Sequence, residues 1–498
     1  MAAPPEQAEV AAFLRDLAGS DPLETHISLV FVGSDTVWKL KKAVRLAFLD
    51  FTSLDSRRRF TLRELELNQP AAPELYRDAV PVVRRADGML AFSERDDVEA
   101  IDWALRMARV PPGDFLDEIA AAGRLNAPLL DALGDTVAMY HSNLSPSKGV
   151  DPVAAMHSVT LGNAQSAIEA ELPVCEVREW RKGIVDALKE IASWLTERER
   201  DGFVRRAHGD LHLGNLCLWN GKPVPFDALE FDEAMATIDL GYDLAFLLMD
   251  LDQRVSRAAA NRVLNRYVAR TGDAALTRAL PAFLSLRAMI RAHVEAKRGN
   301  PRMASPYLAA ALEYLRPERP VVLAIGGLPG TGKTTLARAL APELGRAPGA
   351  LVLRSDEIRK RQYGASPEQR LPQSAYSEAT SEAVLGELTA LVAKTAKGGH
   401  TVIADATFID PRHRCMLAAA AHATAVPFVG LWLHAPLAVL ETRIANRRND
   451  ASDATIATLQ AASRSNPRPG DWIAVEAAES AHTEAQARIA IKCAQSGC

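Results

Sequence analysis

The sequence predicts a mixed α+β and α/β protein built from two successive domains. The first observation is length, because a chain of 498 residues exceeds the size at which a single core stops growing, about 250 to 300 residues. The second is composition, since 48% hydrophobic and 24% charged residues are usual for a globular protein. The third is order: a β-rich stretch precedes a long helical one in the first part, whereas strands and helices alternate in the second.

The charge of the chain and its first residues argue against several classes of protein. A formal net charge of −4 provides no overall field for nucleic acid or anionic membranes. The opening MAAPPEQAEVAAFLRDL lacks the basic and apolar regions of a secretory signal, and no stretch is apolar over the ~18 residues of a membrane helix. We therefore expect a cytoplasmic protein without a membrane partner.

The cysteines form no recognisable site. The five cysteines show neither a CxxC pair nor metal-ligand spacing to histidine; they are Cys175, Cys217, Cys415, Cys493 and Cys498. Reduced thiols are expected, rather than a disulfide framework or a zinc centre.

The first part of the chain predicts a small β-rich lobe followed by a large helical lobe. Two β-rich runs around GSD predict a hairpin in residues 27–41, and runs around ADG predict another in residues 80–92. Between them, SRRRFTLRELELNQ in residues 56–69 predicts a basic, polar helix. Helical patterns then extend to about residue 316, interrupted in residues 207–230 by short strand-like runs around a GK turn.

A domain boundary is predicted where the character of the sequence changes. RPERP in residues 316–320 has the prolines and charges of a linker, so we expect domains at 1–316 and 317–498. Beyond it, the apolar runs VVLAI, LVLR, TVIAD and PFVGLWL alternate with helical stretches. This alternation predicts a parallel sheet with helices on both faces.

The octet HGDLHLGN in residues 208–215, with PFDALEF after it, has the spacing of a phosphoryl-transfer site. Asn215 lies five residues after Asp210, and Asp227 lies seventeen after Asp210. Transfer to a hydroxyl needs a carboxylate that takes or orients the proton, and oxygen ligands that hold Mg²⁺ against the phosphates. Asp210 suits the first task, and Asn215 and Asp227 suit the second.

These residues resemble the loop of the aminoglycoside phosphotransferase and choline kinase family, which has HGDxxxxN followed by a strand that ends in Asp. The resemblance covers about residues 20–316 and implies a bilobal, protein-kinase-like fold. It also implies a lobe lysine on the ATP phosphates, held by a helix glutamate, and assigns these roles to Lys39 and Glu64. Lys41 faces the same side of its strand, so either lysine could contact phosphate. In place of the kinase GxGxxG loop the chain has only FVGSDT.

Other interpretations of this region remain open. HGDLHLGN could be a turn with buried polar groups, although the joint spacing argues against it, or the domain could be a pseudokinase that binds without turnover. We expect His208 to brace the loop, and Asp239 and Asp243 to be structural. His141 is expected to be a packed helix histidine.

GLPGTGKT fits the P-loop pattern GxxxxGK[ST] and lies between a predicted strand and a predicted helix. Glycines allow backbone N–H groups to converge on phosphate, Lys333 reaches the β and γ phosphates, and Thr334 offers its hydroxyl to Mg²⁺. The predicted nucleotide-binding residues are Gly327, Leu328, Pro329, Gly330, Thr331, Gly332, Lys333, Thr334 and Thr335.

Further polar residues after this loop suggest how the P-loop would act. Asp356 follows the second strand, where a carboxylate could take the proton of an acceptor hydroxyl, or could simply cap a helix. Asp405 ends the third strand, at a position for Mg²⁺. Arg443 and Arg447, four residues apart with Arg448 adjacent, could close over the triphosphate or form a solvated helix face.

This combination resembles the small P-loop kinases related to polynucleotide kinase, gluconate kinase and zeta toxins, over about residues 320–498. The resemblance implies that Asp356 activates the acceptor and that Arg359 contacts it. Few aromatic residues occur in residues 362–399, which argues against a nucleic-acid groove and favours a small hydroxylated acceptor, sugar-like or nucleotide-like.

Taken whole, the chain resembles bacterial proteins described as a fused aminoglycoside phosphotransferase-like and ATP-binding P-loop protein. Each half has its own lysine and metal ligands, which predicts two ATP·Mg²⁺ sites rather than one assembled from distant parts. The leading hypothesis is a bifunctional small-molecule kinase. The alternatives are a nucleotide-sensing first domain that regulates the P-loop kinase, and a toxin-like P-loop domain.

Overall fold

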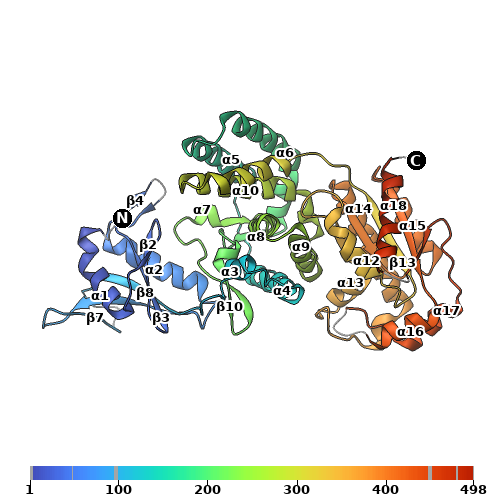
Figure 1. Ribbon diagram of the computed structural model, residues 1–498, viewed down its shortest axis with the longest axis horizontal. Helices are drawn as coiled ribbons and strands as arrows, with labels where there is room; N and C mark the ends of the chain where they lie inside the picture. The colour runs from blue at the N-terminus through green and yellow to red at the C-terminus, as the bar shows by residue number, and fades with distance from the viewer. Residues whose placement is uncertain (1–3, 47–48, 95–98, 447–450, 478–479, 497–498) are drawn as a thin grey trace. The chain divides into compact units, whose positions relative to one another are not determined.

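The computed structural model of the protein describes residues 4–46, 49–94, 99–446, 451–477 and 480–496, except the side chains of 480–481 and 493–496. Contacts divide the chain into two compact units, whose elements are labelled in Figure 1. The first unit comprises Met1–Ala132, Met139–Ala155 and Leu195–Leu247, and the second comprises Leu133–Ala138, Met156–Trp194 and Leu248–Cys498. Helices before the predicted boundary at residue 316 thus group with the second unit, and the boundary itself stays a prediction.

A six-stranded antiparallel sheet forms the β-rich lobe of the first unit. Its order is β1 (Leu23–Glu24), β2 (Ser28–Val32), β3 (Thr36–Lys41), β8 (Asp102–Ala108), β6 (Tyr76–Arg84) and β7 (Leu90–Phe92). Both predicted hairpins are present, as β2 pairs with β3 and β6 pairs with β7.

The two faces of this sheet bury different kinds of side chain. On one face, Leu29, Phe31 and Leu40 pack with Val10 and Leu14 of α1 (Ala8–Ala18). Because side chains alternate along a strand, the neighbours of Leu40 in β3 point to the opposite face. That face receives α2 (Leu54–Asn68), the predicted polar helix, which begins at the N-cap Ser53.

Short elements of the first unit carry the predicted catalytic loop. The strand β9 (Val204–Arg206) pairs with β12 (Thr237–Asp239), and β10 (Leu216–Trp219) pairs with β11 (Lys222–Pro225) around the predicted turn. The remaining elements are β4 (Arg45–Leu46), β5 (Leu49–Asp50), α3 (Leu116–Ala121), α4 (Ala127–Asn143), η2 (Leu213–Asn215), α7 (Glu233–Ala236) and α8 (Leu240–Arg254). Of these, α4 and α8 extend into the second unit.

A five-stranded parallel sheet forms the centre of the second unit. Its order is β14 (Leu351–Arg354), β15 (Val402–Asp405), β13 (Val322–Gly327), β16 (Phe428–His434) and β17 (Ile473–Glu476). Figure 1 shows helices around this sheet, and α12 (Lys333–Leu340) and α18 (Ser480–Ser496) share a core with alternate residues of β13, such as Leu323 and Ile325. The other helices are α13 (Ser355–Gln362), α14 (Glu378–Lys397), α15 (Pro411–His422), α16 (Leu437–Ala445) and α17 (Ile456–Arg464).

Helices that precede the sheet in sequence complete the second unit. They are most of α5 (Pro152–Glu169) and α6 (Val174–Arg200), then α9 (Arg257–Thr271), η3 (Ala274–Arg278), α10 (Leu280–Lys297) and α11 (Pro301–Glu313). Helices α10 and α11 pack against each other, and α9 packs against β14 and α13. The predicted fold class, a β-rich lobe with helices followed by a parallel-sheet α/β domain, is confirmed.

Within the described ranges, no helix is long and apolar enough to cross a membrane. The described cysteines Cys175, Cys217 and Cys415 are free thiols, of which Cys217 is buried and the other two are exposed. Burial raises the pKa of the Cys217 thiol to about 12, so this thiol stays protonated at neutral pH.

His400, just before β15, makes the stability of the second unit sensitive to acid. Its side chain is buried with Nε2 3.0 Å from the Gly349 carbonyl oxygen, and burial lowers its pKa from 6.5 to about 4. As pH falls, His400 of the unfolded chain therefore binds a proton near pH 6.5, before His400 of the folded protein does so near pH 4. The stability that comes from keeping His400 neutral is complete above about pH 6.5 and is lost as pH falls toward 4. His400→Gln keeps an N–H donor but does not titrate.

We expect the wild type to lose about 2 kcal/mol more of its free energy of unfolding than His400→Gln between about pH 7 and pH 5. Urea unfolding of both proteins at the two pH values measures this difference. Equal losses would show that His400 is not held neutral by its burial.

Candidate active sites

Lys39 and Glu64 meet in the first unit, between β3 and α2. The Lys39 ammonium lies 2.7 Å from Glu64 Oε1 and 2.6 Å from Asp227 Oδ1. Burial opposes its charge, but Asp227 and Glu64 outweigh burial and raise the pKa of Lys39 well above its ordinary value. A lysine anchored by a helix glutamate and aimed at the residue predicted to bind Mg²⁺ is placed to contact nucleotide phosphates.

Lys41 lies on the same face but is enclosed. Its side chain is 1% exposed, against 12% for Lys39, and its ammonium lies 2.8 Å from Glu64 Oε2 and contacts Glu230. Burial raises the pKa of Glu230 despite the neighbouring lysines. Accessibility therefore favours Lys39 as the phosphate contact. The sequence analysis missed Glu230, although it lies in the same DALEF stretch as Asp227.

The loop HGDLHLGN places Asp210 and Asn215 against each other. The Asn215 side-chain amide donates to the Asp210 backbone carbonyl and to Asp210 Oδ2, both at 2.9 Å. His212 Nε2 lies 3.5 Å from the same carboxylate oxygen. The Asp210 side chain is 42% exposed, so it remains accessible to a substrate hydroxyl.

Buried residues brace this loop in the way that was expected of them. Asp243 accepts hydrogen bonds from the backbone amides of His208 and Gly209, at 3.2 and 2.8 Å, and lies 3.1 Å from His141 Nε2. His208 Nε2 lies 2.9 Å from the Phe226 carbonyl oxygen. Asp239 pairs with Arg198, with N–O distances of 2.5 and 2.9 Å.

Asp227 has a strained backbone that other buried residues hold in place. Its φ is 60°, in the left-handed region that non-glycine residues rarely adopt and that often marks functional sites. Its amide donates to the Tyr76 hydroxyl at 2.9 Å, and the next amide, of Ala228, donates to Asn68 Oδ1 at 2.9 Å. Tyr76 and Asn68 are functional supports that no sequence motif marks.

The donor set of the first site fits a magnesium ion. Asn215 uses its amide nitrogen for Asp210, which leaves its amide oxygen for a cation. Asp227 uses Oδ1 for Lys39 and has a side chain 41% exposed. Carboxylate and amide oxygens beside phosphates are the ligands that Mg²⁺ prefers.

The predicted P-loop connects β13 to α12 in the second unit. Gly327, Gly330 and Gly332 have φ values of 140°, 86° and 85°, which residues other than glycine rarely adopt. The Lys333 ammonium lies 3.0 Å from the carbonyl oxygens of both Gly327 and Leu328, so its side chain folds back over the P-loop.

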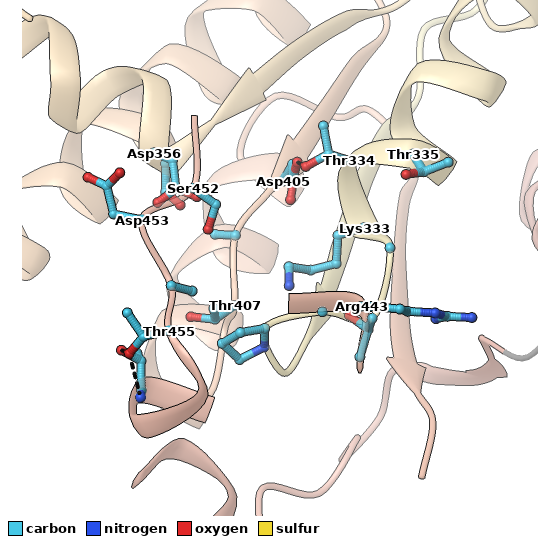
Figure 2. Close-up of a pocket in the computed structure, with 18 of the residues that line it drawn as sticks. Lys333, Thr334, Thr335, Asp356, Asp405, Thr407, Arg443, Ser452, Asp453 and Thr455 are labelled. Carbon is cyan, nitrogen blue, oxygen red and sulfur yellow. Dashed lines mark hydrogen bonds between the residues drawn. The ribbon is translucent and has the colours of Figure 1, made fainter. Parts of the chain in front are cut away.

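Thr334 and Asp405 meet at the carboxyl edge of the sheet. The Thr334 hydroxyl donates to Asp405 Oδ2 at 2.6 Å, and Figure 2 shows both beside Lys333. Asp405 is buried, and Arg354 Nε lies 3.4 Å from the same oxygen. A hydroxyl and a carboxylate next to a phosphate-binding loop are oxygen ligands of the kind that Mg²⁺ takes, and a magnesium site here stays a prediction. Arg354, at the end of β14, was missed.

Asp356 lies in the first turn of α13, just after β14, and lines the same cavity. Ser452 donates a hydrogen bond to its carboxylate. Burial raises the pKa of Asp356, with the Asp405 carboxylate contributing, despite the nearby Arg354. A carboxylate with a raised pKa is a better proton acceptor in a catalytic step. The helix-cap interpretation of Asp356 is wrong, because Arg354 occupies the N-cap position of α13, Asp356 is the second helical residue, and no side chain caps the helix.

The arginines expected at the lid are only partly described. Arg443, on α16, lines the cavity, and Figure 2 shows its side chain extending away from Lys333. Arg447 and Arg448 lie outside the described residues. Arg359, the expected acceptor contact, is buried on α13, donates to the Ala375 carbonyl at 2.6 Å and packs 4.8 Å from the Tyr376 ring.

Asp453 organises the acceptor side of the cavity, which no sequence motif predicted. It accepts hydrogen bonds from the Tyr376 hydroxyl at 2.6 Å and the Leu371 amide at 3.0 Å, and it pairs with Lys360 at 3.2 Å. Burial opposes ionisation, but these partners lower the pKa of Asp453. The network joins three segments that are far apart in sequence.

The cavity that these residues line has a volume of about 930 Å³, and every residue that lines it belongs to the second unit. Its P-loop side and its acceptor side hold different groups. The principal ones are Lys333, Thr334, Thr335, Asp405 and Thr407 on the first, and Asp356, Arg359, Arg370, Tyr376, Ser452 and Asp453 on the second. The volume lies within the range of small-molecule binding pockets.

The chain is similar to one protein family and to several relatives. The family described as "AAA domain" matches residues 322–469. Proteins described as uncharacterized from Mycobacterium tuberculosis (strain ATCC 25618 / H37Rv) and Mycobacterium bovis are each 29% identical over 480 residues. The matches cover 91% of this chain and 90% of each relative.

Solved structures of kinases resemble each part of the chain. The GDP and kanamycin complex of the aminoglycoside phosphotransferase APH(2")-IIIa covers 61% of this chain and 97% of its own, with 13% identity and a TM-score of 0.39. A choline kinase from Cryptosporidium parvum Iowa II covers 61% and 94%, with 9% identity and a TM-score of 0.38. A gluconokinase from Sinorhizobium meliloti 1021 covers 35% and 97%, with 19% identity and a TM-score of 0.26.

All three TM-scores lie below 0.5, so the fold assignment rests on the family match and on the geometry of the two sites. The second unit has the strand, glycine loop and helix of a P-loop, with Lys333 and Thr334 in place. The first unit has an antiparallel sheet with a lysine–glutamate pair and a separate catalytic-type loop. Residues 322–469 accordingly match the family described as AAA domain and carry a P-loop, and they follow a part that holds an antiparallel sheet and the HGDLHLGN loop.

Proposed function

We propose that the protein is an ATP-dependent phosphotransferase with two sites, each of which transfers the γ-phosphoryl group to a hydroxyl of a small molecule. One observation supports this most directly. The Lys39, Asp210, Asn215 and Asp227 set and the Lys333, Thr334, Asp356 and Asp405 set lie in different units. Neither set lacks a chemical group that the other would have to supply.

In the first site, the chain's own residues divide the work of phosphoryl transfer. Lys39, held by Glu64, binds the phosphates of ATP and neutralises charge that develops on them. Asp210 orients the acceptor hydroxyl and accepts its proton. Asn215 and Asp227 would hold Mg²⁺, which would neutralise phosphate charge when bound.

In the second site, the P-loop amides and Lys333 bind the triphosphate at the start of α12. Asp356 takes the proton of the acceptor hydroxyl, and Arg359 contacts the acceptor. Thr334 and Asp405 would hold a second Mg²⁺, and Arg443, which lines the same cavity, would neutralise charge that develops on the triphosphate. A small hydroxylated molecule, sugar-like or nucleotide-like, suits the 930 Å³ cavity, and nucleic acid is not a proposed partner.

Two single variants separate the proposed activities. Incubation of the full chain with ATP, Mg²⁺ and a metabolite library, followed by mass spectrometry, should reveal acceptors that gain one phosphate. Asp210→Ala removes the proton acceptor of the first site, and we expect it to lower that activity by about 10²- to 10⁴-fold while sparing the other. Lys333→Ala removes charge stabilisation in the second site, with an expected loss of about 10²- to 10³-fold there alone.

The outcomes distinguish this proposal from its alternatives. If Asp210→Ala abolished phosphorylation of every acceptor, the two sites would not act independently. If the Lys333→Ala protein bound ATP but phosphorylated nothing, the first site would be a nucleotide sensor rather than an enzyme. ATP binding by this variant can be followed by isothermal titration calorimetry.

A further inference from the structure

The outer edge of the parallel sheet is covered by a helix from outside the P-loop kinase domain. β14 is the edge strand, and α9, which precedes the matched residues 322–469, packs against it. An edge strand exposes unpaired backbone groups, which must find partners where they are buried. Side chains of α9 satisfy several of them.

Two asparagines of α9 replace the missing neighbouring strand. Asn265 Oδ1 accepts a hydrogen bond from the Val352 amide at 2.6 Å. The side-chain amides of Asn261 and Asn265 donate to the Ala350 carbonyl at 3.0 and 3.3 Å. Further along, Arg257 donates to the Gly345 carbonyl. The contact to Val352 binds the backbone of β14 itself, and the others bind the chain that leads into it.

The strand that α9 holds leads directly into the proposed catalytic groups. Val352 lies two residues before Arg354, which contacts Asp405, and four residues before Asp356. On its other side β14 pairs with β15, with Arg354 opposite Asp405. The position of Asp356 relative to the P-loop therefore depends on how β14 is held from both sides.

The same helix also holds the acceptor side of the cavity. Arg266 Nη1 donates to Glu368 at 2.8 Å. Arg370 and Leu371, which follow Glu368 closely in sequence, line the cavity. Arg266 is itself fixed by Asp135, with N–O distances of 2.5 and 2.6 Å. At the end of α9, Gly272 lies against the Arg361 side chain of α13.

We infer that α9 is a positioning element for the P-loop kinase site, in which Asn265 sets the place of Asp356 through β14. Arg266 sets the acceptor segment through Glu368. This inference rests on the proposed activity of the P-loop site. If α9 has this role, turnover at the P-loop site depends on a helix that lies outside the family-matched residues 322–469. The P-loop itself needs no residue of α9.

The test uses the full chain carrying Asp210→Ala, so that only the P-loop site turns over. The probe is ATP·Mg²⁺ with water as acceptor, followed as ADP formation. Adding Asn265→Ala is expected to lower kcat by about 10- to 100-fold, since a small misplacement of a catalytic group costs that much. The KM for ATP should change less than about twofold, because the P-loop contacts are untouched.

Two further variants make this result specific. Asn265→Asp keeps an oxygen that accepts from the Val352 amide but loses the amide that donates to the Ala350 carbonyl, to which Asn261 still donates. It should therefore restore most of kcat, which mere loss of stability would not explain. Asn163→Ala on α5 is the control. Asn163 is also a buried asparagine, but its side chain lies 3.3 Å from His293 and not against β14, so this variant should leave kcat unchanged. Hydrogen exchange at the Val352 amide should accelerate in Asn265→Ala alone.

The possible failures are distinguishable. Equal kcat values for the Asp210→Ala parent and its Asn265→Ala derivative would overturn the positioning role and leave the proposed activity intact. If the parent neither formed ADP with water nor phosphorylated any acceptor of the metabolite library, the proposed activity would be refuted, and the inference would fall with it. If Asn265→Ala did not fold, Glu368→Gln, at a side chain 41% exposed, takes its place: a several-fold lower kcat supports the inference and an unchanged one overturns it.

Discussion

Lys41→Met is expected to destabilise the first unit by about 3 to 5 kcal/mol, the usual effect of removing one partner of a buried ion pair. Lys41 and Glu230 are 1% and 5% exposed, so Glu230 would be left without its ammonium in a buried site. The neighbouring Lys39 keeps Glu64 and Asp227. Urea unfolding of the full chain, with hydrogen exchange of the β3 amides, measures the loss.

A second substitution separates pairing from packing. In Lys41→Met with Glu230→Gln, both charges are gone, and replacement of a whole buried pair is often neutral, so most of the stability should return. If the double variant were as unstable as the single one, the lost stability would come from packing rather than from an unpaired carboxylate.

Lys39→Met is the matched comparison, because Lys39 lies on the same strand and shares Glu64. Its side chain is more exposed, at 12%, and its partner Asp227 is 41% exposed, so we expect a smaller loss of stability. Turnover at the first site should nevertheless fall by about 10²-fold or more, since the phosphate contact is removed. The reverse pattern would make Lys41 the phosphate contact.

Gly327→Ala is expected to weaken ATP binding at the P-loop by at least about 100-fold, through backbone strain of about 1 to 3 kcal/mol and a steric clash in addition. The φ of Gly327 is 140°, and a Cβ there would lie 2.4 Å from the Leu433 carbonyl oxygen of β16. Since β16 is a central strand, the loop has to move instead. The KM for ATP of ADP formation in the Asp210→Ala background, where turnover is confined to the P-loop, measures the change.

Gly386→Ala is the control for a glycine without such a role. Gly386 lies inside α14, and a Cβ there meets no atom within 4 Å. Alanine should therefore raise the free energy of unfolding by about 0.5 to 1 kcal/mol and leave ATP affinity unchanged. Unchanged ATP affinity in Gly327→Ala as well would show that the loop tolerates a side chain at its first position.

Local sequence was sufficient to predict the elements whose functional residues are neighbours in sequence. The P-loop could be predicted from GLPGTGKT because its strand, glycines and helix start are consecutive, and the structure brings Lys333 and Thr334 to the loop as expected. The pairing of Lys39 with Glu64 followed from the family resemblance. The hairpin of β2 and β3 followed from alternation around a turn. The boundary at residue 316 remains a prediction.

The sequence by itself determined the two kinds of domain and the residue types of both sites, because each motif is a short run with fixed spacing. Only the tertiary structure decided which distant residues support them: Glu230 beside Lys41, Asp453 beside Lys360 and Tyr376, and Asn265 on the edge of β14. The physical reason is that buried charges and unpaired strand edges take whichever partner the fold brings near. No periodicity along the chain encodes that choice.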